Sequence, residues 1–344
     1  MSKLLAIDIG GGTQDILLYD DTKTMENCLQ LVLPSPTLLV AGKIRQASAK
    51  GKAIHLYGRL MGGGPSTKAI KDHLALGLTV SSTPNAALTI HDNLETVQEM
   101  GVMIMDEPPA YAEAVRLGDL DTEMLANILA QVGEKLPQEF AVAVQDHGFS
   151  PHESNRIFRF RIWDQFMRAG GKLSALAYRK VPPFLTRMQA VQAEVPGALM
   201  MDTCGAALLG ALTDDIVKEA ACDPIVVINL GNQHSFVAIV QDQQILGLFE
   251  HHTGKMTTEK LTGYIEMLCA GKLTNQEIQD DGGHGCIPPT RSLQVNLRVA
   301  TGPRRGLLPP QDYYFAAPQG NMMLMGSFGL VAANLAHLPL RNNR

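Results

Sequence analysis

Cysteines, aromatic residues and clusters of like charge are all scarce in this sequence, and each scarcity narrows the possible classes of protein. The five cysteines show no CxxC or CxxxCxxC spacing, and their odd number leaves at least one unpaired, so a reducing cytoplasm fits best. Aromatic residues make up 5% of the chain, the formal net charge is −5, and no block of Lys and Arg is long enough to follow a nucleic-acid backbone. Nucleic acid is therefore not expected as a partner.

Long uncharged segments are also few. The first apolar stretch is broken by Asp8 and is too short for the hydrophobic region of a secretion signal, so export is not expected. Met322–Leu340 carries no Asp, Glu, Lys or Arg over about the length that a bilayer requires. Because this segment includes Asn334 and Pro339, we expect a buried helix of a soluble protein rather than a membrane span.

A glycine-rich turn lies between two apolar segments near the start of the sequence. Leu4–Ile9 is expected to form a buried strand and Asp15–Tyr19 its antiparallel partner. Glycines let backbone amides approach an anion, and the carboxylate of Asp8 can hold Mg²⁺ through water beside phosphates. An ordinary glycine-rich hairpin explains the same residues, and this motif alone leaves both interpretations open. The turn consists of Gly10, Gly11, Gly12 and Thr13.

A second hairpin, Pro224–Asp242, repeats this plan. Asn229 and Gly231 take the places of Asp8 and Gly10, and each lies 221 residues after its counterpart. A chain of 344 residues with 45% hydrophobic content is long enough for two cores. The repeat therefore indicates two related domains that face each other and each offer a phosphate-binding turn to a shared cleft.

These segments resemble the actin-like ATPase superfamily, which includes sugar kinases and heat-shock chaperone ATPases. "AIDIGGGTQDILLYD" is similar to its first phosphate motif, "VINLGNQHSFVAIV" to the second, "MMDTCGAALLGALTD" to the hinge helix and "MLMGSFGLVAANL" to the adenosine loop. The resemblance implies an α/β fold of two duplicated ribonuclease H-like domains, residues 1–200 and 201–344, around a central cleft that binds ATP and Mg²⁺. Its further cofactor-binding residues would be Gly231, Asn232, Gln233, Ser235, Gly326, Ser327 and Gly329.

Two departures from the superfamily pattern bear on function. The second phosphate motif usually supplies an aspartate where this chain has Asn229, and the glycines of the adenosine loop, Gly326 and Gly329, are separated rather than paired. We expect a nucleotide-binding phosphotransferase or ATPase that acts on an unidentified small molecule or protein acceptor, with Asp8 organising the magnesium. The alternative is a degenerate member that keeps the fold and binds a ligand without ATP turnover.

A closer resemblance is to a family labelled as pyruvate formate-lyase activating enzymes. The phrases that carry it are "LGLFEHHTGKMT", "DGGHGC", "TGPRR" and "AAPQGNMMLMGSFGL". An activating enzyme of that kind holds an iron–sulfur cluster with three cysteines at CxxxCxxC spacing, which this chain lacks. The label therefore implies no activity.

Polar residues follow the apolar segment "FAVAV" in "FAVAVQDHGFSP". Because side chains just beyond the carboxyl end of a strand face the ligand crevice of an α/β sheet, we expect Gln145, Asp146 and His147 to line a substrate pocket. The segment is similar to a sugar-kinase strand with a polar tip, in which Asp146 would act as a base towards a hydroxyl, with His147 beside it. A polar loop that satisfies its own backbone is the alternative.

Histidines and arginines supply further substrate candidates. Neighbouring histidines on a strand point to opposite faces, so one of His251 and His252 is expected to face the cleft. His284 and Cys286 could join it as zinc ligands, although plain hydrogen-bonding roles explain these residues as well. Arg304, in "TGPRRG", could clamp a phosphate or carboxylate, or lie in a solvated turn.

Two further segments are interpreted as structural. The glycines of Met61–Leu74 do not fit P-loop spacing, and Ser66 or Thr67 is expected to cap a helix there. Asn155–Gly171 is predicted to be an amphipathic helix, with arginines offset from the apolar face. The expected core-facing residues are Phe158, Ile162, Phe166 and Met167.

Overall fold

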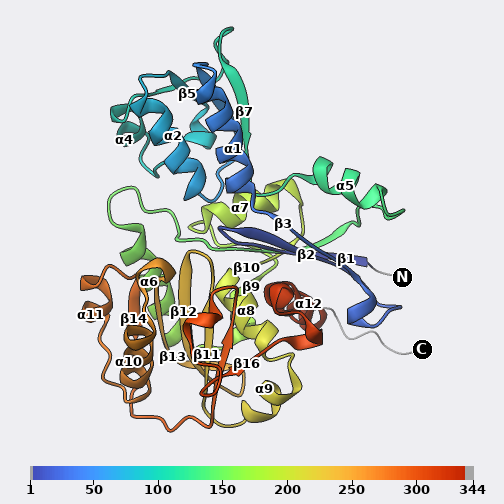
Figure 1. Ribbon diagram of the computed structural model, residues 1–344, viewed down its shortest axis with the longest axis vertical. Helices are drawn as coiled ribbons and strands as arrows, with labels where there is room; N and C mark the ends of the chain where they lie inside the picture. Colours follow the sequence, from blue (N-terminus) through green and yellow to red (C-terminus); the bar gives the residue numbers. More distant parts are fainter. Residues whose placement is uncertain (1–2, 338–344) are drawn as a thin grey trace.

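The computed structural model describes residues 3–337 and contains three β-sheets (Figure 1). In the first sheet, strands β1, β2 and β3 are antiparallel neighbours, whereas β8 and β10 run parallel to β1. The strands in spatial order are β3 (Leu29–Pro34), β2 (Thr13–Asp20), β1 (Lys3–Ile9), β8 (Glu139–Val144), β10 (Leu199–Met201) and β9 (Ala177–Tyr178).

The second sheet repeats this arrangement. Its first three strands in the sequence, β11, β12 and β13, are antiparallel neighbours, and β15 and β16 continue the sheet in parallel on the other side of β11. The strands in spatial order are β14 (Gly285–Ile287), β13 (Gln244–His252), β12 (His234–Gln241), β11 (Ile225–Leu230), β15 (Leu297–Thr301) and β16 (Tyr314–Phe315).

When the edge strands β9 and β14 are left out, the remaining five strands of each sheet lie in the order 3-2-1-4-5, which confirms two duplicated ribonuclease H-like domains. The two predicted hairpins are present, and they close in the same way. The amide of Gly10 donates to the carbonyl of Thr13 at 2.9 Å, and the amide of Gly231 donates to the carbonyl of His234 at 2.9 Å.

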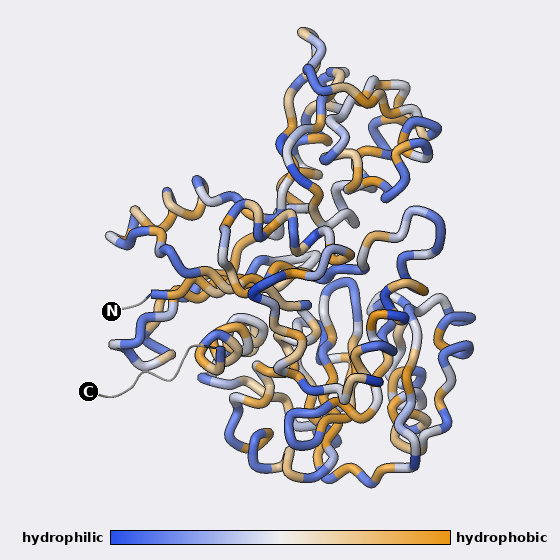
Figure 2. The backbone as a smooth tube through the Cα atoms, turned by 180° about the vertical axis from the view of Figure 1, so that it is seen from behind, coloured by the Kyte–Doolittle hydropathy of each residue, from blue (hydrophilic) through white to orange (hydrophobic). Residues whose placement is uncertain are grey.

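Helices cover the outer face of each sheet and fill the space between the two sheets. Figure 2 shows the hydrophobic segments concentrated in the strands and in the helices that pack on them. Helices α5 (Thr122–Ala130) and α7 (Thr186–Glu194) pack on the first sheet, and α10 (Thr258–Cys269) and α11 (Asn275–Asp280) pack on the second. A single core between the sheets includes α8 (Thr203–Ala211) and α12 (Met325–His337), and α9 (Asp215–Ala220) follows α8.

Helices α8 and α12 approach each other through glycines. A Cβ added at Gly329 would lie 1.9 Å from the carbonyl oxygen of Ala206, and one at Gly210 would lie 1.8 Å from that of Met325. Because α12 packs on β1 and β2, the C-terminal part of the chain returns to the first sheet. The boundary predicted between residues 200 and 201 stays a prediction: it falls within β10, the last strand of the first sheet in the sequence.

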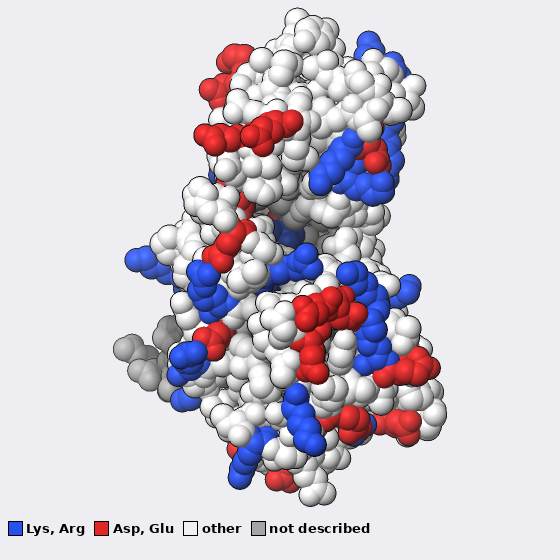
Figure 3. Space-filling view, turned by 90° about the vertical axis from the view of Figure 1, so that its left-hand side faces the viewer, with Lys and Arg blue, Asp and Glu red and all other residues white. Residues whose placement is uncertain are grey.

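A third, all-parallel sheet forms a subdomain inserted between β3 and β8, at the top of Figure 1. Its four strands in spatial order are β6 (Val102–Ile104), β5 (Val80–Ser82), β4 (Ile54–Gly58) and β7 (Glu113–Leu117). Its helices are α1 (Pro36–Ala49), α2 (Pro65–Ala75), α3 (Pro84–Ala87) and α4 (Leu94–Glu99). Figure 3 shows charges of both signs interspersed over one face of the molecule and a hollow beneath this subdomain.

The predicted cap of α2 was wrong. The residue before this helix is Gly64, with a φ of 57°, and the amide of Ser66 donates to the hydroxyl of Thr37, far away in the sequence, at 3.0 Å. The predicted amphipathic helix is present as α6 (Asn155–Arg168), and its predicted core-facing residues are half-buried. The fully buried residues are Arg159, Phe160 and Trp163; the periodicity did not indicate Arg159 because its buried carboxylate partners, described below, come from other elements.

The uncharged segment near the C-terminus was predicted to be a buried helix. It forms a 3-10 turn, Met322–Leu324, and then α12, most of whose residues are buried. Residues 338–340 of the predicted segment lie outside the described part of the chain. Among residues 3–337, no helix combines the length and the apolar character that crossing a membrane requires.

Candidate functional site

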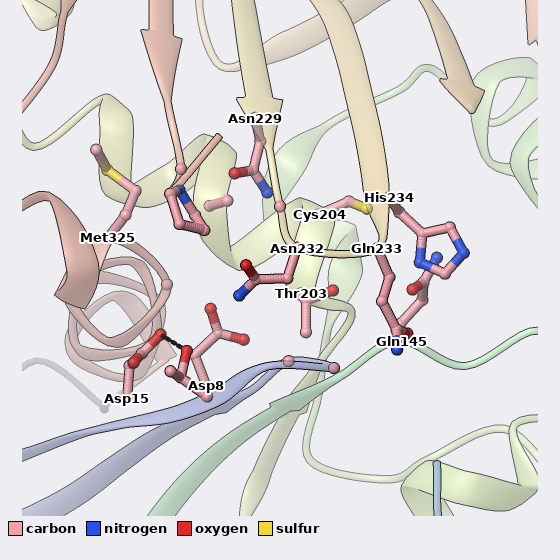
Figure 4. Close-up of a pocket in the computed structure, with 18 of the residues that line it drawn as sticks. Asp8, Asp15, Gln145, Thr203, Cys204, Asn229, Asn232, Gln233, His234 and Met325 are labelled. Carbon is pink, nitrogen blue, oxygen red and sulfur yellow. Dashed lines mark hydrogen bonds between the residues drawn. The ribbon is translucent and has the colours of Figure 1, made fainter. Parts of the chain in front are cut away.

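The two glycine turns face each other across the cleft between the sheets. Figure 4 shows Asp8 and Asp15 on one side, with Asn229, Asn232 and Gln233 reaching in from the other. A cavity of about 100 Å³ lies between the turns. Its lining includes most of the residues predicted to hold a cofactor: Asp8, Gly10, Gly11, Thr13, Gly231, Asn232, Gln233 and Gly326.

The turns touch through side chains of the second domain. A Cβ added at Gly11 would lie 2.3 Å from Cδ of Gln233, and one added at Gly12 would lie 2.3 Å from Nδ2 of Asn232. The cavity is therefore smaller than the roughly 300–1,000 Å³ typical of small-molecule sites. A nucleotide phosphate can enter between the turns only if Asn232 and Gln233 move or the domains separate.

Asp8 lies at the end of β1 with an unsatisfied carboxylate. Among residues 3–337, its Oδ1 is buried and has no hydrogen-bond partner. Burial, together with the neighbouring carboxylates of Asp15 and Asp202, raises the pKa of Asp8 well above its ordinary value. Burial also raises the pKa of Asp15 to about 7, although Thr13 donates a hydrogen bond to it at 3.3 Å. A cation would relieve the cost of ionising this pair, so the site suits Mg²⁺.

Four other predicted residues do not contribute side chains to this cavity. The hydroxyl of Ser235 lies 3.0 Å from that of Thr253, and the hydroxyl of Ser327 donates to the carbonyl of Asp15 at 2.6 Å; both serines are buried. Gly329 packs against α8. Arg304 is exposed and lines neither this cavity nor the neighbouring one described next.

A second cavity, of about 610 Å³, adjoins the first beneath the inserted subdomain. Gln145 and His234 line both cavities, so the two connect at the carboxyl end of β8. The predicted substrate residues Gln145, Asp146, His147 and His252 all line it. The glycines at the start of α2, Gly62, Gly63 and Gly64, form part of its opposite wall.

Asp146 is buried, and its carboxylate accepts hydrogen bonds from two backbone amides. Its carboxylate accepts from the amide of Gly148 at 2.8 Å and from that of Met188 at 2.9 Å. Burial raises its pKa to about 6, against the opposing effect of these two bonds. The residue therefore fixes the loop after β8 and the start of α7, and each of its oxygens keeps a second lone pair.

A buried arginine links the two domains. The apolar pattern of its helix predicted that it would lie away from the core. Arg159 of α6 donates to Asp202, the cap of α8, at 2.7 Å and to Glu250 of β13 at 2.7 Å. Glu250 also accepts from the side chain of Gln145. Burial opposes the charge of Arg159, but its two carboxylate partners outweigh that cost and raise its pKa well above the ordinary value. This network fixes β8, α6, α8 and β13 around the second cavity.

Three histidines from different elements lie close together beside this network, in the loop after β8, at the start of β12 and just before β14. Ring nitrogens of His147, His234 and His284 all lie within 4.8 Å of one another, and the two Nε2 atoms of His147 and His284 are 3.1 Å apart. The ring of His252 is centred 4.8 Å from that of His284. Burial, with Arg159 and the other histidines nearby, lowers the pKa of His234 to about 3 and those of His147 and His284 strongly. These imidazoles are therefore neutral at pH 7.

The predicted zinc ligands meet only in part. His251 is buried on the opposite face of β13, with Nε2 at 2.9 Å from Asp281, and His252 faces the cavity, as strand alternation predicts. The thiol of Cys286 points into the core of the second domain towards the carbonyl of Leu273. His234 was missed, although it occupies the place of Thr13 in the repeated hairpin.

The chain was compared with solved structures. Three of the similar solved structures are a polyphosphate/ATP-glucomannokinase from Arthrobacter sp. strain KM, a "putative sugar kinase" from Cytophaga hutchinsonii, and a Ppx/GppA family protein from Aquifex aeolicus. In that order, their identities are 12%, 11% and 10%, and their TM-scores 0.36, 0.33 and 0.31. The matches cover 98%, 96% and 97% of this chain and 100%, 100% and 90% of theirs. The fold assignment rests on the strand order above, not on these low scores.

Sequence comparison is more specific. No functionally curated protein matches the chain significantly. A family model matches residues 61–307, which is well over half of the chain and includes the second glycine turn and all four clustered histidines. The chain thus belongs to the family described as "Putative pyruvate format-lyase activating enzyme (DUF1786)".

Proposed function

We propose that this protein binds ATP with Mg²⁺ between its two glycine turns and transfers the terminal phosphoryl group to an acceptor in the second cavity. One observation carries the proposal: Asp8 lies between two turns of the same hydrogen-bonded form that approach from opposite domains, and within residues 3–337 one of its buried carboxylate oxygens has no partner. Backbone amides in such turns suit phosphate oxygens, and the carboxylate suits magnesium.

Each part of the chain would have a distinct role. The amides of Gly11 and Gly12 would hold phosphates from the first domain, and those of Asn232 and Gln233 from the second. Asp8, with Asp15 beside it, would hold Mg²⁺, which when bound neutralises charge on the phosphates. Because the first cavity opens to the second at Gln145, an acceptor hydroxyl there would meet the carboxylate of Asp146. Asp146 would then accept the hydroxyl proton.

Binding would require the cleft to open first. Gln233 packs against Gly11 and also against Gly64 of the inserted subdomain, where an added Cβ would lie 2.9 Å from Nε2. This one side chain therefore contacts both the first phosphate turn and the far wall of the second cavity. Hinge separation of the domains, followed by closure on the nucleotide, fits the cleft between two covalently linked domains.

Calorimetric titration with ATP and Mg²⁺ tests the proposal. We expect the unaltered protein to bind, and Asp8→Asn and Gly11→Val to bind at least about tenfold more weakly, because they remove the carboxylate and obstruct the first turn. Asp72→Asn and Gly42→Ala are matched controls, since Asp72 is exposed and a Cβ at Gly42 meets nothing within 4 Å. Equal affinity in all five proteins would contradict the proposal.

The protein side chains that fill the first cavity favour a second function. Asn229 replaces the aspartate expected in the second phosphate motif, and the side chains of Asn232 and Gln233 fill the space between the turns. We infer that, if the nucleotide does not bind, the protein binds a polar small molecule in the 610 Å³ cavity without turnover. Failure of ATP to raise the melting temperature, together with stabilisation by a small-molecule library member, would favour this function.

A further inference from the structure

We propose that His147, His234 and His284 form a binding site for a divalent transition metal of the zinc class, at the boundary of the second cavity. This inference goes beyond nucleotide binding and does not depend on it. The three residues come from the end of β8, the start of β12 and the residue before β14, so only the folded chain brings them together.

The distances fit one ion. Two nitrogens bound to the same tetrahedral zinc, at roughly 2.0–2.1 Å each, lie about 3.4 Å apart. The Nε2 atoms of His147 and His284 are 3.1 Å apart, and all three ligand nitrogens lie within 4.8 Å of one another. A shift of up to about 1.4 Å in the imidazole of His234, which is half-buried, would bring the third nitrogen to bonding distance.

The facing nitrogens of His147 and His284 suit an ion. Their contact, Nε2 to Nε2 at 3.1 Å, can hold only one proton, so at least one of the two atoms already presents a lone pair to the other. A single cation would bind three neutral nitrogens at once.

The nearest buried charge is compensated by carboxylates. Arg159 opposes positive charge at all three histidines, but it is itself paired with Asp202 and Glu250. Three imidazoles without a thiolate are typical of catalytic zinc sites, which keep a fourth position for water or substrate. Since His147 and His234 line the second cavity, that position would face it, with His252 alongside.

Metal titration of the full, untagged chain tests the site. After treatment with EDTA, the protein is titrated with Zn²⁺ in competition with a chromophoric chelator, and with Co²⁺ while the visible spectrum is recorded. We expect one equivalent of each ion to bind, with the Co²⁺ spectrum of a tetrahedral site that changes when azide is added. We expect His234→Ala and His284→Ala to lower zinc affinity at least about 100-fold.

Three control variants should keep the affinity of the unaltered protein: His152→Ala, Cys286→Ala and Asp8→Asn. His152 is exposed, the thiol of Cys286 lies in the core of the second domain, and Asp8 belongs to the proposed magnesium site. Asp8→Asn separates the two proposals, because it should weaken nucleotide binding and leave zinc binding unchanged. Absence of stoichiometric zinc in the unaltered protein, or unchanged affinity in His234→Ala, would overturn the site.

Substitutions near the core can prevent folding, so a second variant is needed. His234→Gln retains the size and polarity of a half-buried side chain, and its melting temperature in EDTA should equal that of the unaltered protein. Loss of zinc binding in this folded variant supports the site. Retention of binding, or a Co²⁺ spectrum that azide leaves unchanged, counts against the proposed three-histidine site with its open position.

Discussion

Gly326 lies directly against the carboxylate of Asp8: a Cβ added to the glycine would be 2.0 Å from Oδ2. Helix α12 and the first glycine hairpin therefore fit together only because residue 326 has no side chain. The contact joins the start of the C-terminal helix to the proposed magnesium ligand. It places a geometric requirement on Gly326 that is separate from any contact with adenosine.

Gly326→Ala should consequently weaken nucleotide binding through Asp8. The methyl group would push the carboxylate away or shift α12, and overpacking of this kind typically costs about 1–3 kcal/mol of unfolding free energy. We expect a lower melting temperature and ATP affinity at least about tenfold weaker. Gly254→Ala is the control, since a Cβ there meets nothing within 4 Å. Unchanged affinity in a folded Gly326→Ala protein would show that the position of Asp8 is unimportant.

The buried network around Arg159 should be essential to stability. Asp202→Asn leaves the guanidinium with Glu250 as its remaining carboxylate partner, and breaking a buried ion pair typically costs about 3–5 kcal/mol. Urea unfolding at neutral pH measures this loss. Lys68, paired with Asp72 on the surface, provides the comparison: Asp72→Asn should cost less than about 1 kcal/mol. Similar costs for both variants would contradict the role of the network.

The same ion pair should have a characteristic pH dependence. Burial alone would raise the pKa of Asp202, but Arg159 outweighs it and lowers the pKa below the ordinary 3.8. A carboxyl group whose pKa is lowered by folding stabilises the protein above its unfolded pKa, and this stabilisation is lost as pH falls through the folded pKa. The stability difference between the unaltered protein and Asp202→Asn should therefore be constant from about pH 5 to 7 and shrink below about pH 4. A difference that grows on acidification would contradict this assignment.

Gln233 is expected to obstruct nucleotide entry. Its side chain occupies the space beside Gly11 and Gly64, whereas the proposed phosphate contacts of this turn are backbone amides. Gln233→Ala removes the obstruction and should raise ATP affinity severalfold, because less binding energy is used to open the cleft. Calorimetry with Asn296→Ala, a distant surface change, as control gives the comparison. A loss of affinity in Gln233→Ala would instead make its side chain a direct ligand.

Asp146 should affect turnover more than nucleotide binding. If it accepts the proton of the acceptor, Asp146→Asn should lower phosphoryl transfer or phosphate release by about 10²–10⁴-fold and leave ATP affinity within about twofold. Phosphate release and calorimetry on the same preparation measure the two effects. Because Asp146 also anchors Gly148 and Met188, an unchanged melting temperature is required as a control. Equal losses of binding and turnover would indicate an anchoring role alone.

Much of the fold could be predicted because its signals are local. Each glycine hairpin joins two apolar strands, and the exact spacing of Asp8 and Asn229 revealed the duplication before any tertiary contact was known. The strand alternation of His251 and His252 is a local property of the same kind. The inserted parallel sheet was less visible, because its strands are only three to five residues long.

The second cavity and its histidines depended on tertiary structure. His147, His234 and His284 are far apart in the sequence, and no ligand spacing connects them. Arg159 lies in a helix whose apolar periodicity points to a different face, and its burial depends on Asp202 and Glu250, which arrive from other elements. One sequence signal for His234 was available. It occupies the position in the second hairpin that Thr13 has in the first, which puts an imidazole at a turn that faces the cleft.

The most direct test of the account is a crystal structure of the protein with a non-hydrolysable ATP analogue and Mg²⁺. We predict that the phosphates lie between Gly10–Thr13 and Gly231–Gln233, that the metal lies beside Asp8, and that the side chain of Gln233 has moved away from Gly11. Density for the analogue at any other place, with Gln233 still packed on Gly11, would contradict the proposed nucleotide site.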